Sequence, residues 1–571
     1  MKILGVHDGH NASVALLEDG KITFALQEER PTNVKNFFGF PEKALNFLFS
    51  HKNIGPKDID FVALSSHYIS SPMSPAMVSR RFGWQGTPLA LVAKKISKLP
   101  LIQKIREKQS LKRRFEILKN LGFEEKKIKI IDHHFGHAAA AYYGLPKNPN
   151  EKYLVLTLDG GGDWLCATVS IGQQGKIKTI AKTPYGHSLG DVYSRTTYLM
   201  GFTPWEHEYK LMGMAPYVGK KHSEKVAAIF NQYLNLDPHN PLIFKRKIFE
   251  DTNHILPRLE KNLKRQRFDN ITAGLQKFTE DLLVRWIRTC IEKTGLNDIL
   301  CSGGVFMNIK ANKIISEIPQ VKSLLIFPSC SDESNSLGSA WALNEELRPG
   351  TSSPLKNYYL GPSFDDKKIE SAVKKESSLK YFEVKKIKNP NKAIARLLAQ
   401  DKIVARATGP MEFGARALGN RSIFADPINH KVIPVINSFI KSRDFWMPFA
   451  PIVLKKNSSR YLKNPKNLSS PYMMMGFDTT TKYEDFIAAI HPADKSARPQ
   501  ILEPGQNPDV QEILEEFERL TGRSILLNTS FNLHGYPIVF GPEEALWTFK
   551  NSGLEYLVMN NFILTKKHDS R

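Results

Sequence analysis

Two histidines and two aspartates form the clearest chemical pattern in the sequence. His133 and His137 stand four residues apart in DHHFGHAAAAYY, so on a helix both imidazoles project from one face. Asp159 precedes a run of glycines and Asp332 lies in PSCSDESNSLG, and both settings are turn-like. Two imidazoles with two carboxylates suit Fe²⁺, Mn²⁺ or Zn²⁺ better than Mg²⁺ alone, and such an ion would polarise phosphate oxygens. With 16 histidines in the chain, the spaced pair alone could also arise by chance.

Three glycine-containing loops are candidates for contact with phosphate. They are Asp8-Gly9, Asp159-Gly160-Gly161-Gly162 and Ser302-Gly303-Gly304. Glycine lets backbone amides approach phosphate oxygens, while a nearby Asp can bind a cation or an attacking water. The chain has no GxxxxGK[ST] and no GxGxxG after a strand, so Walker and dinucleotide chemistry are not indicated. A single Asp-Gly is usually only a hairpin turn, but three such loops together favour a nucleotide site.

The elements that position these loops occur twice. Residues 1–30 predict strand, turn, strand, turn, strand, and the pattern returns over residues 153–181. This repeat predicts a duplicated α/β domain, and here the chain resembles the actin, hexokinase and Hsp70 superfamily, whose halves close on a nucleotide. We expect that domain over residues 1–350, a linker rich in Pro, Gly and Ser over 351–366, and a second α/β domain over 367–571.

The C-terminal part predicts an anion pocket. Cations come from Arg416, Arg421, Lys441, Arg443 and Arg498, and short polar groups follow a predicted strand at Asn528, Thr529, Ser530 and Asn532. Guanidinium forks with hydroxyl and amide donors suit a small planar or phosphate anion. The alternative is a set of solvated loop residues, which the mixture of Gly-rich turns and interleaved Arg disfavours.

Charge and composition limit the class of protein. The 571 residues carry a formal charge of +23 and are 41% hydrophobic, which excludes a disordered or collagen-like chain. Residues 94–129 alone reach +9, from 13 basic and 4 acidic residues. Such a run can attract nucleic acid, an anionic membrane or acidic substrates, but apolar residues at helical spacing favour a solvated helical face. Four scattered cysteines, no signal peptide and no membrane span predict a cytoplasmic protein.

Taken together, the motifs resemble the O-carbamoyltransferases of nodulation and of nebramycin and cephamycin biosynthesis. The resemblance covers nearly the whole chain and is most specific in EHEYKLMGMAPY, MEFGARALGNRSIFADP, HPADKSARPQ and NTSFNLHGYPIV. It implies a metal-binding domain similar to the tRNA threonylcarbamoyltransferase, followed by a YrdC-like domain. The YrdC-like domain would make carbamoyl adenylate from carbamoyl phosphate and ATP with Mg²⁺. The first domain would transfer the carbamoyl group to an acceptor hydroxyl of a small molecule or sugar.

The same resemblance implies a role for individual residues. It makes His133, His137, Asp159 and Asp332 ligands of one divalent transition metal, with Fe²⁺ placed before Mn²⁺ and Zn²⁺, and puts His10 beside the acceptor, where it could accept the hydroxyl proton. Residues implied in nucleotide and carbamoyl adenylate binding are Asp8, Gly9, Lys35, Gly160, Gly161, Lys210, Gly303, Gly304 and Asn308. Residues implied in carbamoyl phosphate and ATP binding are Arg416, Lys441, Arg443, Arg498, Asn528 and Ser530.

Two positions depart from the family pattern, and two alternative functions stay open. Met447 stands where the family usually has Arg, and Ser334 where it commonly has Gly. A tRNA threonylcarbamoyladenosine enzyme would use the basic runs as a phosphate track. A non-enzymatic ATP-binding scaffold of the actin/Hsp70 class would not need His10. The sequence does not identify the acceptor.

Overall fold

The computed structural model describes residues 1–97, 99–376, 381–441 and 444–567. It divides into two compact units, the first formed by Met1–Glu28 with Asn36–Lys356 and the second by Glu29–Lys35 with Asn357–Arg571. The segment Glu29–Lys35 is thus part of the second unit, although it lies early in the sequence. Among the described residues, no helix is both long enough and apolar enough to cross a membrane.

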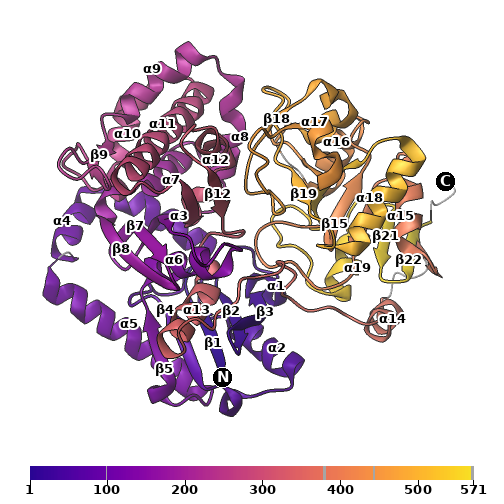
Figure 1. Cartoon of the computed structure of the whole chain (residues 1–571), viewed down its shortest axis with the longest axis horizontal. Helices are drawn as coiled ribbons and strands as arrows, with labels where there is room; N and C mark the ends of the chain where they lie inside the picture. Colours follow the sequence, from indigo (N-terminus) through magenta and orange to yellow (C-terminus); the bar gives the residue numbers. More distant parts are fainter. Residues whose placement is uncertain (98, 377–380, 442–443, 568–571) are drawn as a thin grey trace. The chain divides into compact units, whose positions relative to one another are not determined.

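The first unit contains two five-stranded sheets with the same topology (Figure 1). One sheet has the order β3 (Lys21–Gln27), β2 (Ser13–Glu18), β1 (Lys2–His7), β4 (Phe61–Ser65), β5 (Ile128–Ile131). The other has the order β8 (Lys176–Pro184), β7 (Leu165–Gln173), β6 (Tyr153–Gly162), β11 (Asp298–Ser302), β12 (Ser323–Ile326). In each sheet the first three strands pair antiparallel and the last two parallel. The repeat confirms the predicted duplicated domain of the actin/hexokinase/Hsp70 kind.

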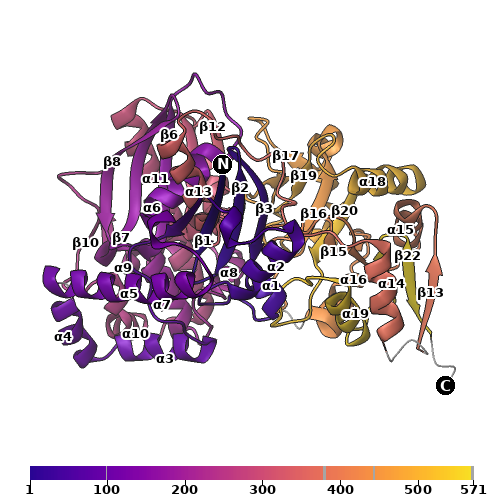
Figure 2. The same ribbon diagram turned by 90° about the horizontal axis from the view of Figure 1, so that it is seen from below.

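Two helices pack together between the sheets. Helix α6 (His133–Gly144) contacts β6, β7 and β11, whereas α13 (Ser334–Leu347) contacts β1, β2 and β4. The helices also pack closely on each other, as both views show (Figure 2). Small residues permit this approach, because a Cβ added to Gly338 would lie 1.9 Å from the carbonyl oxygen of Gly136. The N-terminal turns of α6 and α13 therefore lie next to each other.

Further helices surround the two sheets. They are α2 (Glu42–Lys52), α3 (Pro75–Gln85), α4 (Pro88–Ser97), α5 (Pro100–Asn120), α7 (Leu189–Leu199), α8 (Glu208–Met214), α9 (Lys220–Phe230), α10 (Leu256–Leu263), α11 (Phe268–Thr294) and α12 (Ile309–Ser316). A short hairpin joins β9 (Leu234–Leu236) to β10 (Phe244–Arg246).

The basic run of residues 94–129 is helical as far as Asn120, as predicted, but it is not a plain solvated face. Lys98 lies outside the described residues, and Pro100 begins a new helix there because proline fits the first helical turn. Arg114 is only 1% exposed, while Ile96, Leu99 and Ile105 are 43–54% exposed. The predicted solvated face is confirmed for most basic residues of this helix, which are exposed, but Arg114 is inside and three apolar residues are outside.

The second unit is built on one eight-stranded mixed sheet. Its strand order is β13 (Phe382–Lys386), β22 (Phe562–Lys566), β21 (Tyr556–Met559), β14 (Val404–Ala407), β15 (Arg421–Ala425), β20 (Ile525–Ser530), β16 (Ala450–Leu454), β19 (Gln500–Leu502). A two-stranded sheet pairs β17 (Leu462–Lys463) with β18 (Asp478–Thr479). The helices are α1 (Glu29–Thr32), α14 (Asp366–Lys375), α15 (Pro390–Ala399), α16 (Val432–Ile436), α17 (Ser458–Tyr461), α18 (Pro508–Thr521) and α19 (Pro542–Lys550).

Helices cover both faces of this sheet, which therefore has two hydrophobic cores. Side chains of α14 and α19 pack with Ala405, Ile423 and Leu527 on one face. Side chains of α15 and α18 pack with Val404, Phe424 and Leu526 on the other face. Adjacent strand residues point to opposite faces, so each strand contributes to both cores. The loops at the strand ends carry the polar residues considered below.

Candidate active site

Four predicted ligands meet in the first unit. His133 and His137 come from the first turns of α6, Asp159 from the end of β6, and Asp332 from the turn before α13. One ligand atom from each side chain lies within 4.8 Å of the other three. The two Nε2 atoms lie 3.4 Å from Oδ2 of Asp159 and 3.6 and 3.7 Å from Oδ1 of Asp332. The structure therefore brings together the whole predicted set.

The donor set fits a transition-metal ion. Bonds of about 2.1 Å to nitrogen and oxygen imply separations of roughly 3.0–4.2 Å between ligand atoms, and the four measured separations fall in that interval. Oδ1 of Asp332 is buried and has no hydrogen-bond partner among the described residues. A buried carboxylate oxygen without a donor is unfavourable unless a cation is present. The cluster could thus hold one divalent ion.

The surroundings shift the pKa values of the two aspartates in opposite directions. Burial raises the pKa of Asp332 well above its usual range, and the charge on nearby Asp159 raises it further. Burial also opposes ionisation of Asp159, but His133 and His137 bring the pKa of that carboxyl well below its usual range. Burial lowers the pKa of His133, yet the hydrogen bond that its ring donates to Asp159 and the charge of Asp332 raise it overall. The metal-free cluster therefore carries protons that an ion would displace.

Serine hydroxyl groups contact Nδ1 of both histidines and so orient the rings. Nδ1 of His133 lies 3.1 Å from Oγ of Ser66, and Nδ1 of His137 lies 3.1 Å from Oγ of Ser334 and 3.3 Å from Oγ of Ser302. A partner at Nδ1 directs Nε2 of each ring toward the carboxylates, and Nδ2 of Asn335 also lies 3.2 Å from Nε2 of His137. Ser334 is the residue that departs from the family pattern, and its hydroxyl adds a contact that glycine cannot make.

A buried arginine, which no sequence pattern indicated, lies next to the site. Arg114 donates from Nε and Nη2 to the two carboxylate oxygens of Asp8, both at 2.7 Å. It also donates to the carbonyl oxygens of Ser65 at 2.5 Å and Ser66 at 2.7 Å. Asp8, predicted to contact nucleotide, is 5% exposed and forms this ion pair instead of lying open. The sequence did not distinguish Arg114, because it stands among many other basic residues.

His10 lies on the same loop as Asp8 and Gly9. Its carbonyl oxygen accepts a hydrogen bond from Nε2 of His7 at 3.0 Å, and Nδ1 of His7 contacts Oγ of Ser65 at 2.6 Å. Burial lowers the pKa of His7 well below its usual range, and the charge of His133 lowers it further, so His7 is a neutral ring. The His10 ring is partly exposed and lies 5.5 Å from the Trp205 ring, centroid to centroid.

The glycine loops pack tightly around Asp159. The N–H of Gly160 donates to Oδ1 of Asp159 at 2.6 Å, and a Cβ added to Gly304 would lie 2.9 Å from the same oxygen. Gly161 has φ +150° and faces Tyr185, while Gly303 has φ +108° and faces the backbone of Leu158. A side chain at either position would meet these atoms at 2.0–2.3 Å. The loops therefore surround the metal-type cluster closely.

The remaining predicted nucleotide residues are dispersed. Asn308 caps α12 and exchanges two amide hydrogen bonds with Gln276. Lys210 on α8 lies over the ring of Phe202 at 5.3 Å. Lys35 belongs to the second unit, in the segment Glu29–Lys35.

In the second unit, a lysine and two polar residues meet at the end of β20. Nζ of Lys441 donates to the carbonyl oxygen and Oγ of Ser530, and to Oδ1 of Asn532 at 2.6 Å. Asn528, two residues earlier on the strand, is 1% exposed and donates to the carbonyl oxygen of Ala417. Ala417 follows Arg416, so the predicted residues 416, 441, 528 and 530 come from neighbouring segments. Arg443 lies outside the described residues, and Arg498 is partly exposed just before β19.

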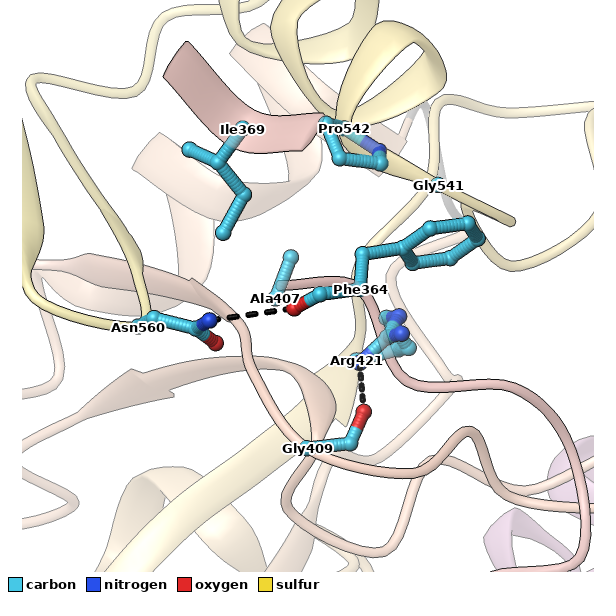
Figure 3. Close-up of a pocket in the computed structure, with 8 residues that line it drawn as sticks. All are labelled: Phe364, Ile369, Ala407, Gly409, Arg421, Gly541, Pro542 and Asn560. Atoms are coloured by element: carbon cyan, nitrogen blue, oxygen red, sulfur yellow. Dashed lines mark hydrogen bonds between the residues drawn. The ribbon is translucent and has the colours of Figure 1, made fainter. Parts of the chain in front are cut away.

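Arg421 is buried, and backbone carbonyl oxygens already accept hydrogen bonds from its guanidinium. Its guanidinium donates to the carbonyl oxygens of Thr408 and Gly409 at 3.2 and 3.0 Å, and burial lowers its pKa to about 10. A cavity beside it has a volume of about 10 Å³, which is room for about one water molecule (Figure 3). The cavity is lined by Phe364, Ile369, Ala407, Gly409, Arg421, Gly541, Pro542 and Asn560. The structure therefore does not support the expectation that Arg421 binds a substrate anion.

Two family models match this chain. The carbamoyltransferase N-terminus matches residues 2–341, and the carbamoyltransferase C-terminus matches residues 395–566. The chain belongs to the carbamoyltransferase family. It is accordingly a carbamoyltransferase enzyme, and the alternative of a non-enzymatic scaffold is wrong. The first match contains all four residues of the cluster.

Similar proteins cover nearly the full length of the chain. It is 31% identical to Uncharacterized protein sll1178 of Synechocystis, over 98% of this chain and 95% of that one. It is 27% identical to Nodulation protein NolNO of Sinorhizobium fredii, over 98% of this chain and 79% of that one. Among solved structures, full-length HypF in its phosphate- and nucleotide-bound form is 14% identical, with a TM-score of 0.33, over 62% of this chain and 56% of that one. This last likeness is too low to support an argument.

Proposed function

We propose that this carbamoyltransferase is an ATP-dependent O-carbamoyltransferase, which makes carbamoyl adenylate and transfers its carbamoyl group to a hydroxyl of a small molecule or sugar. The observation that carries the proposal is the cluster of two histidines and two aspartates, whose ligand atoms lie within 4.8 Å of one another. Such a donor set suits a divalent transition metal, with Fe²⁺, Mn²⁺ and Zn²⁺ as candidates. An ion there would supply a Lewis acid for the phosphate oxygens of the adenylate.

His10 is the proposed general base for transfer. Its ring is partly exposed, and its loop is fixed by the hydrogen bond from His7 and by the Asp8–Arg114 ion pair. A neutral imidazole within hydrogen-bond reach of the acceptor could remove the hydroxyl proton as the oxygen attacks the carbamoyl carbon. The carbamate ester would form as the bond from the carbamoyl carbon to the AMP phosphate breaks, and AMP would leave.

The proposed adenylation site is in the second unit, which we infer to be YrdC-like. Lys441 would supply the buried cation, Asn528 and Ser530 the short polar donors, and Arg416, Arg443 and Arg498 the guanidinium groups for carbamoyl phosphate and ATP with Mg²⁺. The contact of Lys441 with Ser530 and Asn532 supports a shared polar site at the end of β20. In this step carbamoyl phosphate would be hydrolysed to carbamate and inorganic phosphate. A carbamate oxygen would then attack the α-phosphorus of ATP, which forms carbamoyl adenylate and releases pyrophosphate.

The two steps can be tested separately by measuring pyrophosphate and AMP. Wild-type protein with metal, carbamoyl phosphate and ATP should release pyrophosphate, and a hydroxyl acceptor should then cause AMP release. Arg498→Ala should abolish pyrophosphate release, whereas Arg519→Ala, at an exposed ion pair with Glu516, should not. His10→Ala should retain pyrophosphate release but lower acceptor-dependent AMP release by about 10²–10⁴-fold. Absence of pyrophosphate from the wild type would refute the proposal.

A further inference from the structure

Exposed apolar side chains are concentrated on the helices α3, α4 and α5. Large hydrophobic residues that are more than a third exposed number 19 among the described residues, and seven of them lie between residues 77 and 105. They are Met77, Trp84, Leu89, Ile96, Leu99, Leu101 and Ile105, with exposed fractions from 43% to 76%. The three helices follow one another and α4 contacts both others, so these exposed residues lie on adjacent elements of the first unit.

Helix α5 presents the reverse of the usual amphipathic arrangement. Its inner face carries Ser110, Arg114 and Leu118, which are buried, and Arg114 forms the ion pair with Asp8. Its outer face carries Leu101 and Ile105 one turn apart, with lysines between and beyond them. An outer face with leucine and isoleucine is not needed for packing within this unit. Helices α4 and α5 lie at the rim of the first unit in Figures 1 and 2.

The same surface is strongly positive. On α5 the exposed basic residues are Lys104, Arg106, Lys108, Lys112 and Lys119, and the only acidic residues of the helix are Glu107 and Glu116. Lys104, Lys108 and Lys112 are each four residues apart, so they lie along the stripe that holds Leu101 and Ile105. Long lysine side chains can extend their ammonium groups past an apolar layer. We call this surface of α3–α5 the basic apolar face.

We propose that the basic apolar face docks on a membrane surface rich in anionic lipids. Apolar side chains interleaved with lysines, and an exposed tryptophan at the edge, match the boundary between acyl chains and anionic headgroups. Nucleic acid would use the lysines but would leave the exposed leucines and isoleucines in water. A second copy of the same face would bring like charges opposite each other. The anionic bilayer is the occupant that satisfies both the charge and the apolar area.

Vesicle sedimentation with the full chain tests the proposal. At about 0.1 M salt the protein should bind vesicles of phosphatidylcholine with 30% phosphatidylglycerol and should not bind pure phosphatidylcholine. Changing Lys104, Lys108 and Lys112 together to Gln should weaken binding roughly a hundredfold, because each basic residue near an anionic surface contributes about fivefold. Leu101→Ser with Ile105→Ser should weaken it about tenfold or more, although every charge remains.

Control variants distinguish binding through this face from nonspecific binding to vesicles. Phe249→Ser removes a side chain that is 76% exposed elsewhere in the unit, and Lys220→Gln removes an exposed lysine of α9, so neither should change binding. No binding to the anionic vesicles would overturn the proposal. So would tighter binding to tRNA that the Leu101 and Ile105 changes leave intact, or a concentration-dependent dimer that those changes abolish.

Discussion

Ser66 shows how one residue connects the basic helix to the metal-type cluster. Its backbone is in the left-handed region with φ +69°, which a serine adopts only when its surroundings impose it. Arg114 donates to its carbonyl oxygen, and its own Oγ contacts Nδ1 of His133. The guanidinium therefore fixes the backbone that presents the hydroxyl, and the hydroxyl fixes the ring. Arg114 is a positioning residue for His133.

We predict that Arg114→Lys weakens binding of Mn²⁺ or Zn²⁺ by about 10–100-fold while the fold is retained. Lysine keeps the charge next to Asp8 but cannot donate to both carboxylate oxygens and two carbonyl groups at once. Calorimetric titration would measure the affinity, with circular dichroism to check the fold. Arg113→Lys is the control, because Arg113 contacts residues 69–71 instead. Equal affinities of the two variants would contradict the assignment.

The protonation of the cluster predicts how pH controls its metal affinity. The pKa values of Asp332 and His133 are raised, so both groups carry protons further toward neutral pH than usual, and an ion must displace them. Because these pKa values are raised on folding, their contribution to metal-free stability is present at low pH and is lost as pH rises. The pKa of Asp159 is lowered, so its contribution to metal-free stability is fully present near neutral pH and adds no pH dependence there.

The gain in thermal unfolding midpoint on adding excess Mn²⁺ should therefore increase from pH 6 to pH 8. Each displaced proton contributes up to about a tenfold change in affinity per pH unit, so two such groups give a binding slope of at most about a hundredfold per unit. Asp332→Asn should reduce both the gain and its pH dependence. A gain that is constant across this range would show that metal binding displaces no protons.

At the scale of elements, the crossing of α6 and α13 sets the distance between the ligands. Helix α6 carries both histidines, and α13 starts two residues after Asp332. Their closest approach is at Gly136 and Gly338, where an added Cβ would overlap backbone or side-chain atoms at 1.9–2.4 Å. The atom that an added Cβ of Gly338 would meet is the backbone carbonyl oxygen of Gly136, so the helices themselves must separate if Gly338 is enlarged.

Gly338→Ala should lower the free energy of unfolding by about 2 kcal/mol or more and should weaken metal binding, because it forces the two helices apart. Urea denaturation would measure the first effect and metal titration the second. Gly219→Ala at the start of α9 is the comparison, since no atom lies within 4 Å of its added Cβ and its change should stay below about 1 kcal/mol. If Gly338→Ala and Gly219→Ala lower the free energy of unfolding equally, the close approach of α6 and α13 does not set the geometry of the cluster.

The sequence was most informative where a pattern depends on local geometry. The i, i+4 spacing predicted the two histidines on one helical face, and the repeated hairpin predicted the duplicated sheets. Ser66 and Arg114 could not be predicted, because nothing local distinguishes a buried arginine from its exposed neighbours in the basic run. Arg421 was predicted in an anion pocket for the same reason, since sequence does not show that carbonyl oxygens already accept its hydrogen bonds.

At the scale of the whole molecule, the chain enters the second unit twice. Residues Glu29–Lys35 belong to that unit, and the chain then returns to the first unit until Lys356. Arg30 in this segment is 2% exposed and donates from Nη2 to the carbonyl oxygen of Gly414 at 2.5 Å. Gly414 has φ +106° and stands two residues before Arg416, so an early segment of the chain supports a loop of the proposed adenylation site.

This connectivity predicts that cutting the chain near Lys356 does not release a complete second unit. With a protease site placed between residues 351 and 356, the two fragments should still elute together after cleavage, because the first fragment supplies part of the second unit. Arg30→Ala should weaken this association about a hundredfold, since removing a buried arginine costs on the order of 3 kcal/mol. Arg348→Ala, at an exposed ion pair with Asp19, is the control and should leave it unchanged. Fragments that separate at once in the wild type, or equal association in both variants, would mean that Glu29–Lys35 is not required by the second unit.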